Sequence, residues 1–439
     1  MKLLLVYPPF CTPASPPYSL VKLAAFLKAN SEIDLEILDL NLRFHGLKWK
    51  GWQEYFHNFT LKDYGEKAKE FLKLTADVYA ENNRKVVNGK NPELLNQLVK
   101  EIKDQKADYV AFSVVYSSQA FYTLALLKKL KNTIIGGPAV NEKLIKATTH
   151  YPKNEVELLE LLGGKVEYDK LKGDNMLEFG NLKNYFVKTP VIPIRTASTC
   201  YYQQCTFCSH HQSKPYQEFD LKTVQETIKK AKQVFLIDDM ITKNRLLELA
   251  KLFKPLKIKW MCQLKPKEWD RKSLQILSDS GLKAVIWGVE SGCQRILDLM
   301  KKGTKMEEIA QVLKDSKAAG IKNGIYIMWG FPTETEAEIK QTINFLQENK
   351  ESIDLISTSA FGLQKGTPIY QHPEQFRITK VIEEKRTVLE PKISYEISEG
   401  LNQEEVVKLK RKYQRVIEQL NHYPKEMNFF REHWLNVCT

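Results

Sequence analysis

The sequence predicts an α/β protein in three parts: a parallel-sheet domain, a partial barrel of strand–helix units and a C-terminal helical extension. Short apolar runs alternate with helix-length amphipathic segments along most of the first 361 residues, which is typical of parallel sheets covered by helices. Weak periodicity and several glycines at residues 140–188 interrupt this pattern and divide it into two series. A chain of 439 residues is long enough for two or three domains.

The first series predicts a domain over residues 1–145. Its expected strands are residues 2–7, 35–40, 109–115 and 133–135, and its expected helices are residues 20–28 and 119–131. Residues 41–100 have a helix-like pattern that contains many aromatic and polar residues, so we interpret them as an insertion. Residues 146–188 are interpreted as a connector to the second series.

Ligands of open parallel sheets bind beyond the carboxyl ends of the strands. In the first series those ends are the proline-rich segment 8–17, the loop that begins at Ser113, and Gly136 with Gly137. Glycine there lets a bulky ligand approach the backbone closely. The same residues would also suit ordinary strand-to-helix turns, and without the rest of the chain that is the favoured interpretation.

The second series is more regular and predicts a partial (β/α)6 TIM-type barrel over residues 189–375. The expected strands are residues 191–199, 234–237, 258–264, 284–289, 324–328 and 355–361. The expected helices between them are residues 221–232, 244–253, 272–280, 306–320 and 336–347. Residues 376–439 are expected to be helical, with the amphipathic tail 402–439 forming a cap over the barrel mouth.

Active sites of such barrels lie at the carboxyl ends of the strands. Four of the six expected strands end in residues suited to a site, namely Cys200–Cys208, Asp238 with Asp239, Glu290 with Ser291, and Gly330 with Phe331. One such residue would usually be a helix cap or a turn. Four sets on one rim predict a functional site.

The most specific feature on this rim is the spacing Cys200-x4-Cys205-x2-Cys208, while the other four of the seven cysteines are scattered. Three thiolates on one loop can converge on a soft metal centre. An iron–sulfur cluster with three protein ligands leaves one iron open to a small molecule. Zinc completed by His210 or His211, or three unligated thiols, are the alternatives. A disulfide framework is not expected in a chain of this length and cysteine content.

Composition sets the remaining bounds. The chain is 43% hydrophobic and 27% charged, as in a globular protein, and no run of about 18 apolar residues predicts a membrane span. The net charge of +13 could attract nucleic acid or an anionic cofactor. We favour the interpretation that this charge reflects a solvated, lysine-rich surface, because the sequence has no evident patch that is rich in arginine or that alternates basic and aromatic residues. Reduced cysteines indicate a cytoplasmic protein.

Together these motifs resemble the radical S-adenosylmethionine (SAM) superfamily, in the branch whose Rossmann-like, cobalamin-binding-like domain precedes the barrel. The matching segments are Pro8-Pro9, Phe112-Ser-Val, Gly136-Gly-Pro138, the cysteine loop with Thr206-Phe207, Leu236-Ile-Asp-Asp239, Trp287-Gly-Val-Glu-Ser-Gly292, Met328-Trp-Gly-Phe-Pro332 and Gly366-Thr-Pro368. Two features of that branch are missing. The first half has no Asp-x-His-x-x-Gly, and residues 152–157 replace the expected Gly-Glu-Gly-Glu turn.

The resemblance implies roles for individual residues. Cys200, Cys205 and Cys208 would ligate a [4Fe-4S] cluster whose open iron binds SAM. The implied SAM contacts are Phe207, Asp238, Asp239, Glu290, Ser291, Gly330 and Phe331. Ser113, Gly136 and Gly137 would lie at a cobalamin site.

The activity implied by the resemblance is reductive cleavage of SAM to activate an unactivated C–H bond, in a cobalamin-dependent C-methyltransferase. The alternatives are cyclisation, sulfur insertion or epimerisation without cobalamin, or a zinc-stabilised nucleic-acid-binding protein. The expected partners are a small-molecule or peptide substrate and an electron donor such as flavodoxin or ferredoxin, with neither a membrane nor nucleic acid.

Overall fold

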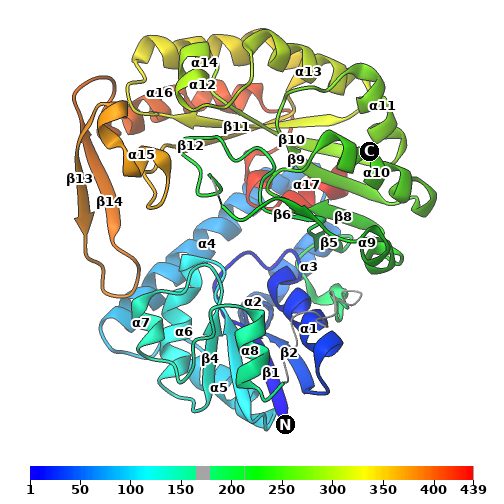
Figure 1. Ribbon diagram of the computed structural model, residues 1–439, viewed down its shortest axis with the longest axis vertical. Coiled ribbons are helices and arrows are strands. Elements are labelled where there is room, and N and C mark those ends of the chain that lie inside the picture. Colours follow the sequence, from blue (N-terminus) through cyan, green and yellow to red (C-terminus); the bar gives the residue numbers. More distant parts are fainter. Residues whose placement is uncertain (165–177, 212, 439) are drawn as a thin grey trace. The chain divides into compact units, whose positions relative to one another are not determined.

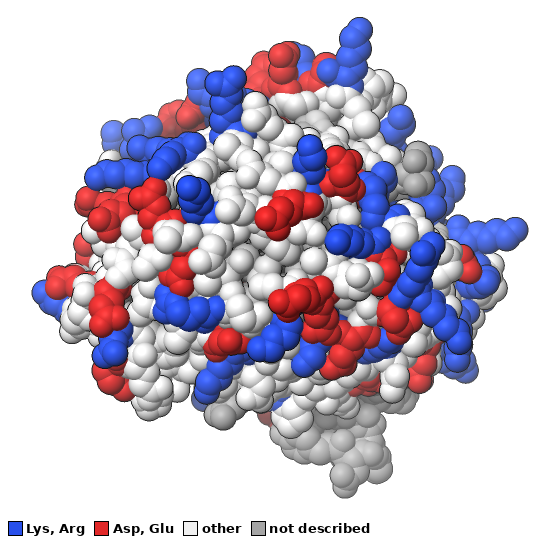
Figure 2. All heavy atoms as spheres, turned by 90° about the horizontal axis from the view of Figure 1, so that it is seen from above, with Lys and Arg blue, Asp and Glu red and all other residues white. Residues whose placement is uncertain are grey.

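The computed structural model describes residues 1–164, 178–211 and 213–438. The chain forms two compact units (Figure 1). The first comprises Met1–Pro193 with Lys385–Pro391, and the second comprises Ile194–Glu384 with Lys392–Thr439. In the described part of the chain, no helix is both long enough and apolar enough to cross a bilayer. The face shown in Figure 2 carries basic and acidic side chains interspersed with one another.

The N-terminal unit is built on a four-stranded sheet of order β2-β1-β3-β4. The strands are β1 (Lys2–Tyr7), β2 (Asp34–Asp39), β3 (Tyr109–Ser113) and β4 (Thr133–Gly136), and they pair in parallel. Leu3 and Leu5 of β1 pack against Leu20 and Leu27 of α1 (Tyr18–Asn30) in a buried core. The expected parallel sheet is therefore present.

Between β2 and β3 the chain forms four helices, at the place of the expected insertion. These are α2 (Leu40–Lys48), α3 (Lys50–Asn58), α4 (Leu61–Val87) and α5 (Leu95–Asp104). The carboxylate of Asp39 accepts a hydrogen bond from the Leu42 backbone N–H and so fixes the start of α2. Phe44, Trp49 and Phe71 pack edge-to-face in an aromatic cluster of this insertion.

The stretch expected to be a connector contributes a helix to the N-terminal core. Asn154 caps α8 (Glu155–Leu161) through two backbone N–H groups. Leu158, Leu159 and Leu162 are buried with the side chains of β1 and α1. The helices α6 (Ala120–Leu127) and α7 (Glu142–Ile145) flank β4 in the sequence. Residues 165–177 of the expected connector lie outside the described residues.

A six-stranded sheet of order β12-β11-β10-β9-β8-β5 belongs to the second unit except for the first residues of β5, and it does not close into a full barrel. Its strands are β5 (Val191–Ile194), β8 (Gln233–Leu236), β9 (Lys259–Leu264), β10 (Leu282–Glu290), β11 (Lys322–Trp329) and β12 (Leu355–Ala360). The helices are α9 (Leu221–Ile228), α10 (Lys243–Phe253), α11 (Arg271–Asp279), α12 (Gln294–Leu299), α13 (Met306–Ala318) and α14 (Glu336–Glu348). The prediction of a partial barrel is confirmed.

The expectation of helix throughout residues 376–439 is wrong for its first part. After the short α15 (Pro368–Gln371), strands β13 (Ile378–Glu384) and β14 (Lys392–Ile397) pair as an antiparallel hairpin. Tyr395 of β14 packs on Phe361, in a cluster that also contains Ile378. Apolar residues on one face of each strand therefore favour strand over helix here. Helices α16 (Gln403–Leu420) and α17 (Arg431–Val437) follow.

Helix α17 does not lie at the barrel mouth, where the tail was expected to form a cap. Asn323 of β11 bonds Ser316 in α13, so its side chain points to the outer helices. Its neighbour Gly324 points the other way, because side chains alternate along a strand, and there it meets the Trp434 indole of α17. Gly324 lies near the amino end of β11. Helix α17 therefore fills the bottom of the open barrel, opposite the rim where the cysteine loop lies.

Candidate functional site

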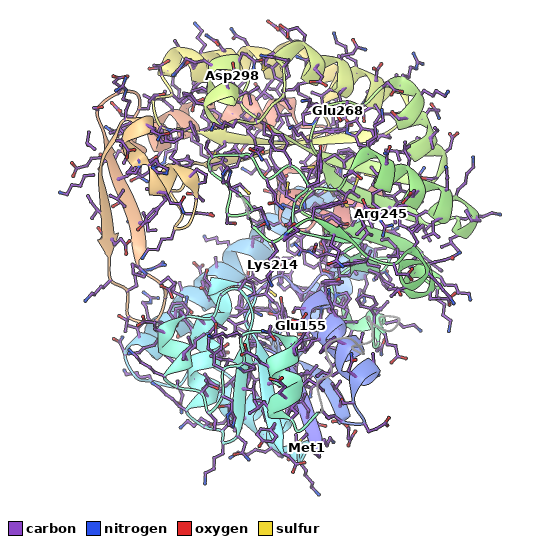
Figure 3. The ribbon with its side chains drawn as sticks, in the orientation of Figure 1. Met1, Glu155, Lys214, Arg245, Glu268 and Asp298 are labelled. Atoms are coloured by element: carbon purple, nitrogen blue, oxygen red, sulfur yellow. The ribbon has the colours of Figure 1, made fainter. Side chains whose placement is uncertain are left out.

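The cysteine loop is held by short structural elements on both sides. Strands β6 (Ala197–Ser198) and β7 (Gln217–Glu218) pair antiparallel and close its base. Figure 3 labels Arg245 of α10, whose buried guanidinium donates to the carbonyls of Thr196 and Phe219 beside this pair. In the middle of the loop, the Thr206 N–H donates to the Met300 carbonyl at the end of α12. The loop is therefore anchored to the barrel independently of any metal.

A cavity of about 220 Å³ opens beside the loop, at the carboxyl ends of β8 to β11. All three motif cysteines line it, and their thiols are free and half-buried. The remaining lining residues are Tyr202, Phe207, His210, Asp239, Met240, Gln263, Leu264, Lys265, Ile286, Gly288, Glu290, Lys302 and Tyr326. The three thiols predicted to act together are thus brought to one cavity.

The thiols need a positive partner to ionise in this site. Burial raises the pKa of Cys205 to about 11, and burial also raises the pKa of Cys208, although the His210 N–H donates to the Cys208 sulfur at 3.4 Å. A bound metal lowers the pKa of a coordinating thiol and offsets this desolvation. Without a metal, burial therefore favours the neutral thiols, and a bound metal would have to offset that cost.

Among the described residues, no group of three or more His, Cys, Asp or Glu side chains is placed to hold a single metal ion. A [4Fe-4S] cluster does not require its protein sulfurs to meet at one atom, because each thiolate ligates a different iron at a corner of the cube. Three separated thiols around one cavity fit that requirement.

Two buried lysines face the same cavity, and the sequence reasoning missed both. The Lys302 ammonium lies 2.9 Å from a carboxylate oxygen of Glu290. Burial lowers the pKa of Lys302, but the charges of Glu290 and Cys205 and the hydrogen bond to Glu290 raise it overall. Lys265 directly follows β9, and its ammonium lies 3.2 Å from the centre of the Tyr202 ring. Burial, and then the nearby charge of Lys267, lower the pKa of Lys265 to about 8.

The two predicted aspartates have different surroundings. Asp239 lines the cavity, where Arg195 donates to it at 2.7 Å and His210 lies 3.3 Å away. Burial raises the pKa of Asp239, but the hydrogen bond from His210 and the charge of Arg195 lower it overall. Asp238 does not line the cavity. Its carboxylate accepts from the backbone N–H groups of Thr196 and Ala197 and so ties β8 to the start of the cysteine loop.

Glu290 and Ser291 are likewise separated. Glu290 lines the cavity and pairs with Lys302. Ser291 is fully buried, its hydroxyl accepts from the Cys293 N–H, and it lies outside the cavity. Of these two expected SAM contacts, the structure brings only Glu290 to the cavity.

The expected SAM contacts at Gly330 and Phe331 do not reach the cavity either. A Cβ at Gly330 would lie 2.3 Å from Val406 of α16. Phe331 is fully buried against Phe361, with ring centres 5.3 Å apart. Phe207 both lines the cavity and packs on this aromatic cluster, so Phe331 supports the cavity wall indirectly.

A second cavity, of about 260 Å³, lies in the N-terminal unit and is lined by residues of α1, β3, β4 and α8. It contains all three residues expected at a cobalamin site, Ser113, Gly136 and Gly137. The hydroxyls of Ser113 and Ser19 lie 2.9 Å apart. Gly137 has φ +112°, and a Cβ there would lie 2.4 Å from the Val114 carbonyl. Glu155, labelled in Figure 3, lines the cavity at the start of α8.

Residues 194–346 match the family model of the radical SAM superfamily. This segment contains the cysteine loop and most of the barrel, so the second unit carries a radical SAM domain. The family resemblance inferred from the motifs is confirmed, and the family implies a [4Fe-4S] cluster and SAM as cofactors.

Two relatives illustrate the extent of the sequence similarity. An uncharacterized methyltransferase of Pyrococcus horikoshii is 26% identical over 184 residues, which cover 38% of this chain and 39% of the relative. The tRNA-2-methylthio-N(6)-dimethylallyladenosine synthase of Thermotoga petrophila is 25% identical over 190 residues, covering 38% of this chain and 42% of the relative. The chain thus spans less than half the length of these relatives.

Two solved structures share the fold over most of the chain. The cobalamin-dependent SAM radical enzyme OxsB, solved with aqua-cobalamin and SAM, superposes with a TM-score of 0.61 at 14% identity, covering 95% of this chain and 66% of OxsB. The radical SAM methyltransferase TsrM of Kitasatospora setae superposes with a TM-score of 0.58 at 13% identity, covering 88% of this chain and 79% of TsrM. The chain therefore shares the fold of these structures over most of its length.

Proposed function

We propose that this chain is a radical SAM enzyme that activates a C–H bond of its substrate and transfers a methyl group with the help of cobalamin. The observation that carries the proposal is the meeting of Cys200, Cys205 and Cys208 at one cavity on the rim of a radical SAM domain. When bound, the cluster and SAM supply a carbon-centred radical able to remove a hydrogen atom from an unactivated carbon.

The chain's own residues bind and orient these groups. The three thiols would hold the cluster, and the backbone contacts of Thr206 fix the loop that presents them. Tyr326 and Gln263, joined by a 3.1 Å hydrogen bond, form part of the cavity lining. Below them, Trp434 fills the barrel and excludes water from that side.

Anaerobic reconstitution with iron and sulfide tests the cluster and the activity. The wild-type protein should bind four irons per chain and form 5′-deoxyadenosine from SAM and dithionite, because a radical SAM cluster has that stoichiometry and chemistry. Cys205→Ser should lose both. Cys11→Ser, in the N-terminal unit, is the matched control and should keep both. One zinc per chain and no 5′-deoxyadenosine would refute the proposal.

Cobalamin binding is supported by the cavity between α1 and α8 and by the fold shared with OxsB and TsrM. Gly136 lines this cavity, and a Cβ there meets no atom within 4 Å, so Gly136→Leu should fill the space with little backbone strain. Cobalamin supplied to the purified protein should add corrinoid absorbance to the wild type and to Gly51→Leu, a control in α3 with equal space, but not to Gly136→Leu. Absence of corrinoid from the wild type would remove methyl transfer and leave the radical activity.

A further inference from the structure

The cavity that holds the three cysteines contains one buried cation without an anionic partner. Lys265 is only 4% exposed. None of the hydrogen bonds or ion pairs of the described residues uses its ammonium, which faces the Tyr202 ring instead. A buried ammonium is unfavourable unless an anion offsets it. In contrast, Lys302 is neutralised by Glu290 at 2.9 Å.

The position of Lys265 ties it to the cysteine loop. Tyr202 stands two residues after Cys200, and its hydroxyl donates to the Lys301 carbonyl at 2.8 Å. The ring is thus fixed between the loop and the segment after α12. Gly303 keeps this space open, since a Cβ there would lie 2.3 Å from the Tyr202 hydroxyl and 3.3 Å from the Lys265 ammonium. Both residues line the cavity, and the ring contacts the ammonium through a cation–π interaction.

We propose that Lys265 is a positioning residue that raises the reduction potential of the cluster. Three thiolates and an oxidised [4Fe-4S]2+ core carry one net negative charge, and uptake of one electron adds a second. A fixed positive charge nearby stabilises the reduced form more than the oxidised form, and net charge is one of the factors that set such potentials. Lys302 also faces the cavity, but Glu290 at 2.9 Å offsets its charge. This inference depends on the cluster of the proposed function.

The test is an anaerobic redox titration of the reconstituted protein without SAM, with dithionite as the one-electron donor and the signal of the reduced cluster as the readout. Lys265→Met should shift the reduction equilibrium about tenfold toward the oxidised form, equivalent to 59 mV for one electron. Lys265→Arg should restore the wild-type potential. Lys267→Met removes the same charge two residues further on, where the side chain is 36% exposed, and should shift the equilibrium less than about twofold because solvent screens it.

Equal potentials in wild type and Lys265→Met would overturn the inference. So would an unchanged SAM-free potential together with weakened SAM binding, because Lys265 would then be a SAM ligand. If Lys265→Met fails to take up iron, the test uses Lys265→Gln and Lys265→Arg instead. Equal SAM-free reduction potentials in these two variants would then overturn the inference. A wild-type protein that takes up no cluster would refute the proposed function itself, and that result is visible before any lysine is changed.

Discussion

The Lys302 ammonium and the Glu290 carboxylate form an ion pair of 2.9 Å at the wall of the cysteine cavity, with side chains only 7% and 12% exposed. Gly288 makes room for it, since a Cβ there would lie 2.8 Å from the Lys302 ammonium. Taking either charge out of water is unfavourable, so each depends on the other. The pair therefore controls both the stability of the rim and the local charge of the site.

Replacing one partner of this ion pair should destabilise the protein more than replacing both partners. Lys302→Met leaves the Glu290 carboxylate buried and unpaired, which should lower the free energy of unfolding by about 3–5 kcal/mol in urea titrations. The double variant Glu290→Gln, Lys302→Met should recover much of this loss. Lys305→Met is the control, because its side chain is 68% exposed and its nearest carboxylate is 3.9 Å away. A loss below about 1 kcal/mol for Lys302→Met would contradict the importance of the pair.

The sequence was sufficient to find the strands of the two parallel sheets because they are continuous apolar runs, whereas it missed the polar strands β13 and β14. The strand expected at residues 284–289 is β10 (Leu282–Glu290), and its residues from Ala284 to Val289 are almost wholly buried. The same runs locate the rim of the barrel. The partial barrel and the loop that carries the three thiols were therefore predictable.

The direction of each side chain on the rim was not predictable. Asp238 and Asp239 are neighbours, so one carboxylate faces the cavity and the other binds the backbone of Thr196. Ser291 points into the protein, toward Thr342. Lys265 was missed because a lysine after a strand is usually solvated. The only available hint was its position, directly at the carboxyl end of the third barrel strand.

Glu334 should make stability depend on pH. This side chain is 1% exposed and accepts from the Gly330 N–H at 2.5 Å. Burial raises its pKa from 4.5 to about 7. Because the folded pKa is the higher one, its stabilising contribution is complete below pH 4.5 and is lost as pH rises from 4.5 to 7. The loss should reach about 3 kcal/mol.

The glutamine variant isolates this effect. In Glu334→Gln, the amide oxygen can still accept from Gly330 but does not ionise. The difference in unfolding free energy between wild type and Glu334→Gln should therefore change by about 3 kcal/mol between pH 4.5 and 8. Urea titrations across this range provide the measurement. Glu336→Gln, at an exposed position, should show almost no change, and parallel curves for wild type and Glu334→Gln would refute the assignment.

Trp434 should be one of the most important side chains of the second unit. It is fully buried in α17, and it fills the bottom of the open barrel beside Gly324. Trp434→Ala removes this volume and leaves a cavity, which should lower the free energy of unfolding by about 3–5 kcal/mol. Trp434→Phe should lose less, because the phenyl ring fills part of the space. A loss of less than about 1 kcal/mol in Trp434→Ala would show that the barrel can close over the gap or that α17 is not seated there.

The opposite change, adding a methyl group under the same indole, tests the same packing from the strand side. A Cβ at Gly324 would lie 2.9 Å from the Trp434 ring, closer than normal contact, and both partners lie in regular elements with little freedom to move. Gly324→Ala should therefore cost about 1–3 kcal/mol through overpacking. The double variant Gly324→Ala, Trp434→Phe should lose less than the sum of the two single variants, because the smaller ring relieves the clash. Gly362→Ala is the control, since a Cβ there meets no atom within 4 Å. Equal unfolding midpoints in urea for Gly324→Ala and Gly362→Ala would mean that the indole does not contact β11.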